Sequence, residues 1–463
     1  MDTICALATA PGGALGIIRV SGPQAFDAVS AICSVRCHDV APNTIRFTRI
    51  IDKTSNLKPQ TSNLIDEVMV SVFRAPHSYT GEDSVEISCH GSRYILNKVL
   101  ELLIQNGCRM AEPGEYTMRA YLNGKMDLSQ AEAVADLIAS TNKATHQMAM
   151  SQLRGHFSSE LARLREQLLK LTSLLELELD FSDHEDLEFA DRSELLELAC
   201  HIESHLHRLA RSFETGQALK QGIPVAIVGK TNVGKSTLLN ALLKDDRAIV
   251  SDIHGTTRDT IEDTIDIHGV TFRFIDTAGI RQTADEVEQI GIQRTYAAID
   301  KARIVLWLID ALPSESEMVD MQDRCQDKSL IIIQNKIDKL GDNSADKLFS
   351  HLTPHTSHLL SISAKFGTNL GDLESAIYQA ADIPALSYSD VIVSSARQYD
   401  ALTRAHSNLA RVLAGLHDDL SDDLIAEDLK LVIEDLAQIT GDKGIILPQE
   451  VLNNIFSHFC VGK

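Results

Sequence analysis

The sequence lacks the long apolar runs, cysteine pairs and basic leader that mark membrane and secreted proteins. No stretch of about 18 consecutive apolar residues occurs, so no membrane-spanning helix is predicted. Residues 1–5 (M-D-T-I-C) contain no basic side chain, and we expect no secretory signal. The 8 cysteines are scattered without a C-x-x-C pair, which argues against a disulfide framework. We therefore expect a cytoplasmic protein with reduced thiols.

Positive charge is scarce relative to negative charge. The 43 Lys and Arg residues are outnumbered by 65 Asp and Glu residues, which gives a net charge of -22 at pH 7. Such a chain repels nucleic acid on average, which argues against a protein that coats nucleic acid but leaves room for a local basic site. Acidic residues crowd between Asp180 and Glu188, where a solvated loop or helix end is favoured over a metal site.

The 463 residues suggest about three domains, and the residue pattern changes three times along the chain. Residues 1–118 mix short β-like runs with Gly/Pro turns, which is typical of an α+β domain. Residues 119–218 carry apolar residues at helical spacing. Residues 219–382 alternate strand-like and helical runs, which predicts βαβ units and a mostly parallel sheet. Residues 383–463 are helical again, so we expect the α/β segment to be inserted into one helical domain.

The strongest motif is a phosphate-binding loop. Residues 229–236 read G-K-T-N-V-G-K-S and match G-x-x-x-x-G-K-[ST]. An apolar run precedes the motif and a predicted helix follows it, which is the context that the motif needs. The glycines let backbone N–H groups wrap around phosphates. Lys235 is expected to reach the β- and γ-phosphate oxygens, and Ser236 is expected to ligate Mg²⁺.

Three further motifs follow in the order typical of a GTPase. Residues 276–279 (D-T-A-G) are expected to hold Mg²⁺ indirectly through the aspartate and to meet the γ-phosphate through the glycine N–H. Residues 335–338 (N-K-I-D) place Asp338 to accept two hydrogen bonds from guanine, a donor pair that adenine lacks. Residues 363–365 (S-A-K) are expected to cover the base with backbone N–H groups. Four motifs in this order predict a P-loop GTPase.

The position after D-T-A-G, where many GTPases carry a water-orienting glutamine, is Ile280. Another group must therefore assist hydrolysis. Thr257 is the expected second Mg²⁺ ligand in a switch loop. The Asn232 amide oxygen can ligate K⁺ beside the phosphates, where K⁺ would act in place of an arginine finger. Glu288 can position water, although its spacing alone favours a solvated helix charge.

Other sequence blocks carry a resemblance that covers nearly the whole chain. They are residues 16–23 (G-I-I-R-V-S-G-P), 79–83 (Y-T-G-E-D), 112–125 (E-P-G-E-Y-T-M-R-A-Y-L-N-G-K), 127–133 (D-L-S-Q-A-E-A) and 459–463 (F-C-V-G-K). In this combination the chain resembles the MnmE (TrmE) family of tRNA modification GTPases. The resemblance implies a multidomain fold of α+β, all-α and α/β parts. An N-terminal folate-binding and dimerisation domain would precede a P-loop GTPase domain that is inserted into a helical domain with a C-terminal Cys-x-Gly-Lys tail.

The resemblance also assigns a folate site. Its residues would be Arg19, Glu86, Lys125 and Lys463, with the cations meeting folate carboxylates and Glu86 bonding the pterin ring. Ordinary surface charges are the alternative interpretation. Cys460 is expected to line this site, without an assigned covalent role.

In the GTPase domain the resemblance completes the ligand sets. It implies Mg²⁺ ligation by Ser236 and Thr257, and catalysis by Glu288 together with Lys235, Asn232 and Thr257. The implied K⁺ ligands are Asn232, Ser251, Ile253 and Thr256. The residues expected to contact GTP are Asn232, Val233, Gly234, Lys235, Ser236, Thr237, Ser251, Asp252, Ile253, His254, Gly255, Thr256, Thr257, Asp276, Thr277, Ala278, Gly279, Asn335, Lys336, Asp338, Ser363, Ala364 and Lys365.

The implied function is K⁺-dependent GTP hydrolysis, activated by dimerisation of the GTPase domains. With an FAD-dependent partner, MnmG (GidA), it would add a carboxymethylaminomethyl or aminomethyl group to C5 of the wobble uridine of certain tRNAs. A 5-formyl- or 5,10-methylene-tetrahydrofolate would supply the carbon, and the chain would form a homodimer within a larger complex. A regulatory GTPase switch and a ribosome-assembly GTPase stay open as alternatives. The first would need no folate site, and the second usually carries an RNA-binding domain and a basic patch.

Overall fold

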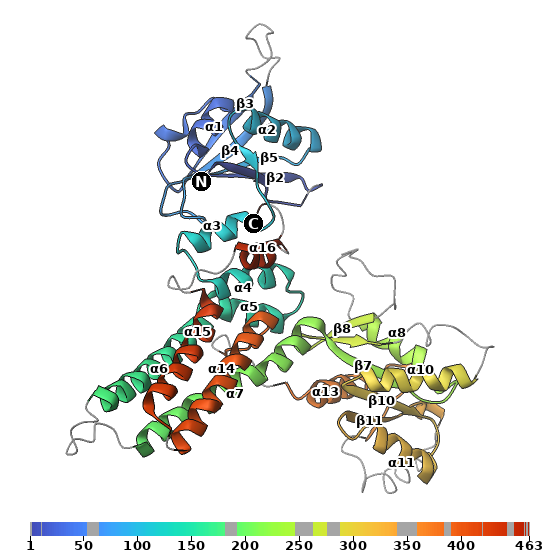
Figure 1. Cartoon of the computed structure of the whole chain (residues 1–463). Coiled ribbons are helices and arrows are strands. Elements are labelled where there is room, and N and C mark those ends of the chain that lie inside the picture. The colour runs from blue at the N-terminus through green and yellow to red at the C-terminus, as the bar shows by residue number, and fades with distance from the viewer. Residues whose placement is uncertain are drawn as a thin grey trace. The chain divides into compact units, whose positions relative to one another are not determined.

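The computed structural model describes residues 2–10, 12–52, 64–180, 192–245, 263–275, 288–339, 359–383, 390–418, 420–441, 449–457, 459 and 462. The chain divides into two compact units. The first unit comprises residues 1–138, 152–206 and 400–463, and the second comprises residues 139–151 and 207–399. Figure 1 labels many of the helices and strands of both units.

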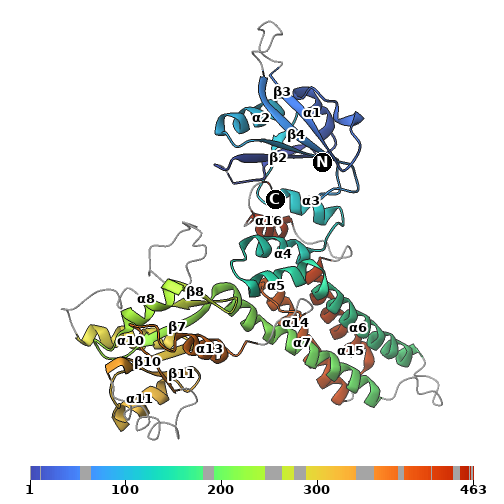
Figure 2. The ribbon, with the colours of Figure 1, turned by 180° about the vertical axis from the view of Figure 1, so that it is seen from behind.

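The first unit contains a six-stranded sheet with the order β3-β4-β5-β2-β1-β6. Its strands are β1 (Ile4–Leu7), β2 (Leu15–Ser21), β3 (Thr44–Ile51), β4 (Leu64–Phe73), β5 (Ser84–His90) and β6 (Arg109–Met110). Along β4, Val68 and Val70 are buried whereas Glu67 and Met69 are exposed, as expected for a sheet covered on one face. Helices α1 (Ala25–Ile32) and α2 (Arg93–Gln105) share the core of the buried face (Figure 2). A short 3₁₀ turn, η1 (Cys37–Asp39), follows α1.

The rest of the first unit is helical. Its helices include α3 (Glu115–Leu122), α4 (Leu128–Ala139), α6 (His156–Asp180), α15 (Asp422–Thr440) and α16 (Gln449–Ser457), and two more, α7 (Arg192–Gln221) and α14 (Ala396–His417), contribute residues to both units. The apolar residues at helical spacing in residues 119–218 include a stripe of leucines that is buried along α6, at Leu161, Leu164, Leu168, Leu171 and Leu175. Helix α15 packs along α6. The C-terminal helix α16 packs on α3, where Phe456 and Phe459 join the core formed by Leu128 and Ala131.

The second unit contains a six-stranded sheet with the order β12-β11-β10-β7-β9-β8. Its strands are β7 (Ile223–Val228), β8 (Asp263–Ile267), β9 (Val270–Phe274), β10 (Ile304–Ile309), β11 (Ser329–Gln334) and β12 (Leu359–Ser361). All neighbours are parallel except β8 and β9, which form an antiparallel hairpin. The helices are α5 (Lys143–Leu153), α8 (Lys235–Asp245), α10 (Glu288–Lys301), α11 (Glu315–Arg324) and α13 (Leu370–Ala380), and a 3₁₀ turn, η2 (Ile337–Lys339), follows β11. The predicted mixture of α+β, helical and parallel α/β parts is confirmed.

The central strand β10 explains why the strands of this sheet appear in the sequence as continuous apolar runs. All six of its residues are buried. Leu306 and Leu308 belong to one core cluster, whereas Val305 and Trp307 belong to a second cluster. The sheet is therefore packed on both faces, as parallel sheets require. Among the described residues, no helix combines the length and the apolar content needed to cross a membrane.

Candidate functional site: a nucleotide cradle and an arginine–carboxylate site

The phosphate-binding loop leaves the carboxyl end of β7 and enters α8. Gly229 and Gly234 have φ angles of 147° and 103°, a region that L side chains rarely adopt. A Cβ atom on Gly229 would collide with the Leu308 carbonyl oxygen, and one on Gly234 would collide with the Asn335 amide nitrogen. The loop lies against the ends of the neighbouring strands, so no side chain fits at either position.

The other loop residues carry polar groups at the start of α8. Asn232 has a φ angle of 64° and an exposed side chain. The Lys235 ammonium donates to the Gly229 carbonyl at 2.5 Å and to the Lys230 carbonyl at 3.1 Å, so it lies within the loop. Burial lowers the pKa of Lys235. Ser236 and Thr237 are exposed in the first turn of α8, where helix N–H groups and the helix dipole favour an anion.

Asn335 joins the phosphate loop to the loop after β12. It is 3% exposed, and its Nδ2 donates to the Val233 carbonyl at 2.7 Å. Its Oδ1 accepts from the Ala364 N–H at 3.1 Å. Val233 is itself buried in the core that also holds Ala364. One side chain therefore fixes the spacing between two loops that the sequence predicts for opposite ends of GTP.

Asp338 lies beside the same loop. The Ser363 hydroxyl donates to its carboxylate at 2.6 Å, and this bond lowers the pKa of Asp338. The carboxylate is therefore kept ionised and oriented, which is what accepting two N–H donors from guanine requires. Lys336 has a φ angle of 66° and pairs with Asp310 at 2.9 Å. Lys365 is exposed beside Phe366, with its ammonium 5.1 Å from the ring centroid.

A second group of predicted residues meets on the sheet of the first unit. Arg19 on β2 and Glu86 on β5 are directly paired across the strands. The Arg19 guanidinium donates to the Glu86 carboxylate from Nε at 2.9 Å and from Nη2 at 2.7 Å. The guanidinium also lies 5.5 Å from the Tyr79 ring centroid and 5.6 Å from that of Tyr116. The site thus combines an oriented carboxylate with two aromatic rings.

The C-terminal tail reaches this site. The Gly462 carbonyl accepts a bond from Arg19 Nη1 at 3.4 Å, and a Cβ on Gly462 would collide with the Leu7 carbonyl. Lys125 is exposed, and its ammonium donates to the Pro76 carbonyl at 2.9 Å. Burial raises the pKa of Tyr79, whose hydroxyl bonds the Thr117 hydroxyl at 2.9 Å. These contacts bring Arg19, Glu86 and Gly462 together, whereas Lys125 bonds the loop between β4 and β5.

Comparison with known proteins identifies the family. The family described as "GTP-binding protein TrmE N-terminus" matches residues 3–125, and the family described as "MnmE helical domain" matches residues 128–460. A tRNA modification GTPase MnmE from Phocaeicola vulgatus is 52% identical over 495 residues, covering 100% of this chain and 99% of that protein. Its counterpart from Parabacteroides distasonis is 52% identical over 468 residues and is covered in full, as is this chain. The chain belongs to the MnmE family.

Among solved structures, the chain is similar to the G domain of the FeoB iron transporter from T. maritima. The identity is 24%, the match covers 35% of this chain and 99% of that one, and the TM-score is 0.26. A TM-score this low does not by itself establish a common fold. The strand order and the loops of the second unit identify its fold independently.

Several residues expected from the MnmE resemblance lie outside the described residues. They are Ser251, Asp252, Ile253, His254, Gly255, Thr256, Thr257, Asp276, Thr277, Ala278, Gly279, Cys460 and Lys463. Glu288 is the first residue of α10, but its side chain also lies outside the described part. The K⁺ ligand set and most of the switch residues therefore stay predictions.

Sequence reasoning missed two contributors to these MnmE-family sites. Tyr79 and Tyr116 both stand in motif blocks that define the resemblance, so their position there was the available signal. Asn335 was predicted to contact GTP, but its contact with the Val233 carbonyl was not predicted, because that contact depends on neighbouring strands that are distant in sequence.

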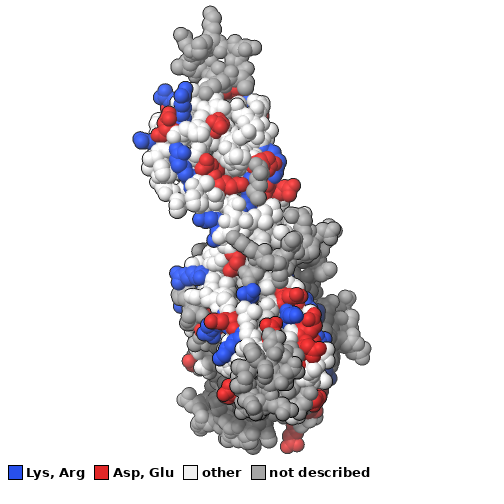
Figure 3. All heavy atoms as spheres, turned by 60° about the vertical axis from the view of Figure 1, so that its left-hand side comes forward, with Lys and Arg blue, Asp and Glu red and all other residues white. Residues whose placement is uncertain are grey.

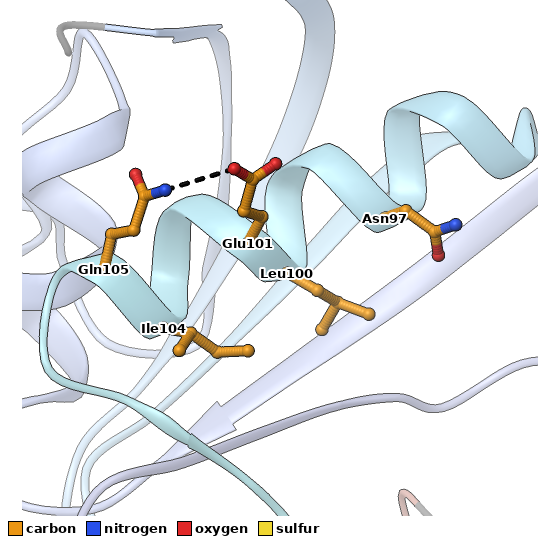
Figure 4. A pocket seen from close by; sticks show the side chains of 5 residues that line it. All are labelled: Asn97, Leu100, Glu101, Ile104 and Gln105. Atoms are coloured by element: carbon orange, nitrogen blue, oxygen red, sulfur yellow. Dashed lines mark hydrogen bonds between the residues drawn. The ribbon is translucent and has the colours of Figure 1, made fainter.

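Other surface features of this MnmE-family member lie apart from the predicted residues. An open depression on α2 is lined by Asn97, Leu100, Glu101, Ile104 and Gln105. Figure 4 shows the two apolar side chains on one side of the helix, while Gln105 bonds Glu101 on another. On the face seen in Figure 3, basic and acidic side chains of the described residues are interspersed, without one continuous basic area. Neither feature identifies a tRNA-binding surface.

Proposed function

We propose that the second unit binds and hydrolyses GTP with Mg²⁺ and K⁺, and that hydrolysis drives C5 modification of the wobble uridine in tRNA. As a member of the MnmE family, the chain is a tRNA modification GTPase. The observation that carries the nucleotide assignment is the bridge that Asn335 forms between the phosphate loop and the loop after β12, whose Ser363 hydroxyl bonds Asp338. This bridge would hold the phosphate end and the base end of the proposed nucleotide site at a fixed spacing.

The roles of the described residues follow from their chemistry. Gly229 and Gly234 leave a cradle that a Cβ atom would fill, and its backbone N–H groups can bind phosphate oxygens. Lys235, with its lowered pKa, would exchange its carbonyl partners for the β- and γ-phosphates. The Asp338 carboxylate would accept hydrogen bonds from guanine. The Ser236 hydroxyl, in the first helical turn, fits a Mg²⁺ ligand, and the ion would neutralise phosphate charge when bound.

The K⁺ proposal depends on Asn232. Its positive φ angle and exposed amide are compatible with an oxygen ligand beside the phosphates, although its partners Ser251, Ile253 and Thr256 lie outside the described residues. K⁺ would supply positive charge where the sequence offers no catalytic glutamine. Glu288 would orient the attacking water from the start of α10.

A tetrahydrofolate derivative would bind beside Arg19 and Glu86 in the first unit. Glu86 can accept N–H donors of a pterin ring, and Tyr79 and Tyr116 offer apolar faces. Arg19 holds the carboxylate in place. Lys125 would meet the folate carboxylates, together with Lys463, which lies outside the described part. The folate would supply the one-carbon unit, the FAD-dependent partner MnmG would supply redox chemistry, and the chain would act as a homodimer.

The test compares GTP turnover in KCl and in NaCl at equal ionic strength. K⁺ should accelerate turnover, and N232A or E288A should lower kcat on the order of a hundredfold, the usual effect of losing one preorganised stabilising group. The matched control is E315A, which removes an exposed carboxylate from α11 and should leave turnover unchanged. Equal rates in the two salts would overturn the cation mechanism and favour a binding switch that awaits an external activator.

A further inference from the structure

Helix α5 stands far upstream of the phosphate loop in sequence, yet it is part of the second unit. Ala144 and Met148 are each 5% exposed and belong to the same core as Ile265 and Val270 of the β8–β9 hairpin. The helix is therefore packed into the GTPase core rather than merely adjacent to it in sequence.

The start of α5 is fastened to the hairpin by two hydrogen bonds. Asn142, 9% exposed, donates from Nδ2 to the Thr271 hydroxyl on β9 at 2.7 Å. The Ala144 N–H donates to the Gly269 carbonyl in the hairpin turn at 3.0 Å. The approach is close, because a Cβ on Gly269 would lie 2.9 Å from the Lys143 Cβ.

The Asn142 side chain is hydrogen-bonded through both ends of its amide. Its Oδ1 accepts from the Thr145 N–H at 2.8 Å and so caps the helix, while its Nδ2 donates to the hairpin. The hairpin turn is tight as well, since His268 and Gly269 have φ angles of 54° and 83°, as in a two-residue turn. The contact thus joins two stiff elements.

The hairpin's place in the chain gives this contact a consequence for catalysis. Strand β8 follows the segment with Thr257, and β9 leads into Asp276, the residues predicted to act on Mg²⁺. Among the described strands, β8 pairs only with β9 and forms the edge of the sheet. The sheet holds this strand on one side only, helices α8 and α13 also pack on it, and His268 of the turn lies edge-on to the Tyr378 ring of α13. The docking of the turn on α5 adds two hydrogen bonds to these contacts.

We propose that Asn142 and Thr271 are positioning residues for GTP hydrolysis, because they hold against α5 the β8–β9 hairpin, which is continuous in sequence with both predicted catalytic segments. This inference rests on the proposed GTPase site but not on the identity of the activating cation. Neither residue would touch the nucleotide. Their contribution would be to the alignment of the reacting groups, where small displacements are costly.

The test uses four single variants of the full-length chain and the N142S/T271V double variant. N142S keeps a capping hydroxyl but is too short to reach β9, and T271V removes the acceptor while keeping the side chain's shape. N142D keeps the reach, because the Thr271 hydroxyl can donate to a carboxylate. T264V is the matched control, since Thr264 is an exposed threonine on the other strand of the same hairpin.

We expect N142S and T271V each to lower kcat about three- to tenfold, with KM and GDP affinity within about twofold of the parent chain. The double variant should be no slower than the slower single variant, because both remove the same bond. N142D should restore most of kcat, and T264V should match the parent. Thermal unfolding, measured in parallel, checks that each variant is folded at the assay temperature.

An unchanged kcat in N142S and T271V, even with a lowered Tm, would reduce the contact to a structural one and overturn the proposal. An equal loss of kcat in T264V would do the same. If the parent chain hydrolyses GTP equally fast in Na⁺ and K⁺, the cation mechanism fails while this comparison still stands, so the two failures are distinguishable.

Discussion

Replacing Asn335 by alanine tests whether the two loops form one nucleotide site. The substitution takes the Asn335 donor from the Val233 carbonyl and the acceptor from the Ala364 N–H, both in a buried setting. Loss of a partner costs a buried polar group about 1–3 kcal/mol, so two such losses total about 2–6 kcal/mol. If this total cost is about 2 kcal/mol and destabilises only the nucleotide-bound state, GDP affinity should weaken about 30-fold.

The assay is the dissociation rate of a fluorescent GDP analogue, followed by stopped flow in N335A and in the parent chain. The matched control is N240A, which removes an exposed amide from the neighbouring helix α8 and should change the rate less than about twofold. N335A should retain its preference for guanine over adenine, because Asp338 still carries the reading carboxylate, whereas D338A should lose that preference. A change of less than about threefold in N335A would refute the bridge as a determinant of affinity.

Three further predictions concern the first unit. Arg119 is 2% exposed within a carboxylate cluster, so R119M should lower the free energy of unfolding, measured by denaturant titration, by about 3–5 kcal/mol. The control R93M, on the exposed side of α2, should lower the same free energy by less than about 0.5 kcal/mol. The hydrogen bond from Arg109 lowers the pKa of Asp2 to about 2. The stability that the Asp2 carboxylate contributes is therefore present above the ordinary pKa of aspartate and is lost as the pH falls toward 2. D2N should flatten that part of the pH–stability curve, and an unchanged curve would contradict this prediction. R19M should weaken binding of 5-formyl-tetrahydrofolate at least about tenfold in calorimetry, because it frees the carboxylate on β5, and unchanged affinity would remove the folate site from this face.

Much of the fold follows from the sequence pattern because its signals are local. The apolar runs of the α/β segment became β7, β9, β10, β11 and β12, and the leucine stripe became the buried side of α6. Both patterns depend only on the period of side chains along one element. The phosphate loop was equally readable, since its strand, glycines and helix are contiguous.

Contacts between residues that are distant in the sequence could not be predicted in the same way. The Asn335 amide meets Val233 and Ala364 because β7, β10, β11 and β12 stand in that order in the sheet, which no local pattern encodes. The pairing of Arg19 with Glu86 likewise depends on the register of β2 against β5. Motif positions predicted which residues matter, whereas their partners required the three-dimensional arrangement.

Helix α5 shows most clearly which features the sequence pattern does not predict. Its apolar residues Ala144 and Met148 would fit a helical bundle as well as they fit the GTPase core, so spacing alone assigned it to the helical segment. In the chain it lies between α4 and α6, most of whose residues belong to the first unit. The hydrogen bonds from Asn142 to Thr271 and from Ala144 to Gly269, together with the shared core, show that α5 packs with the β8–β9 hairpin, and they join residues that lie far apart in the sequence.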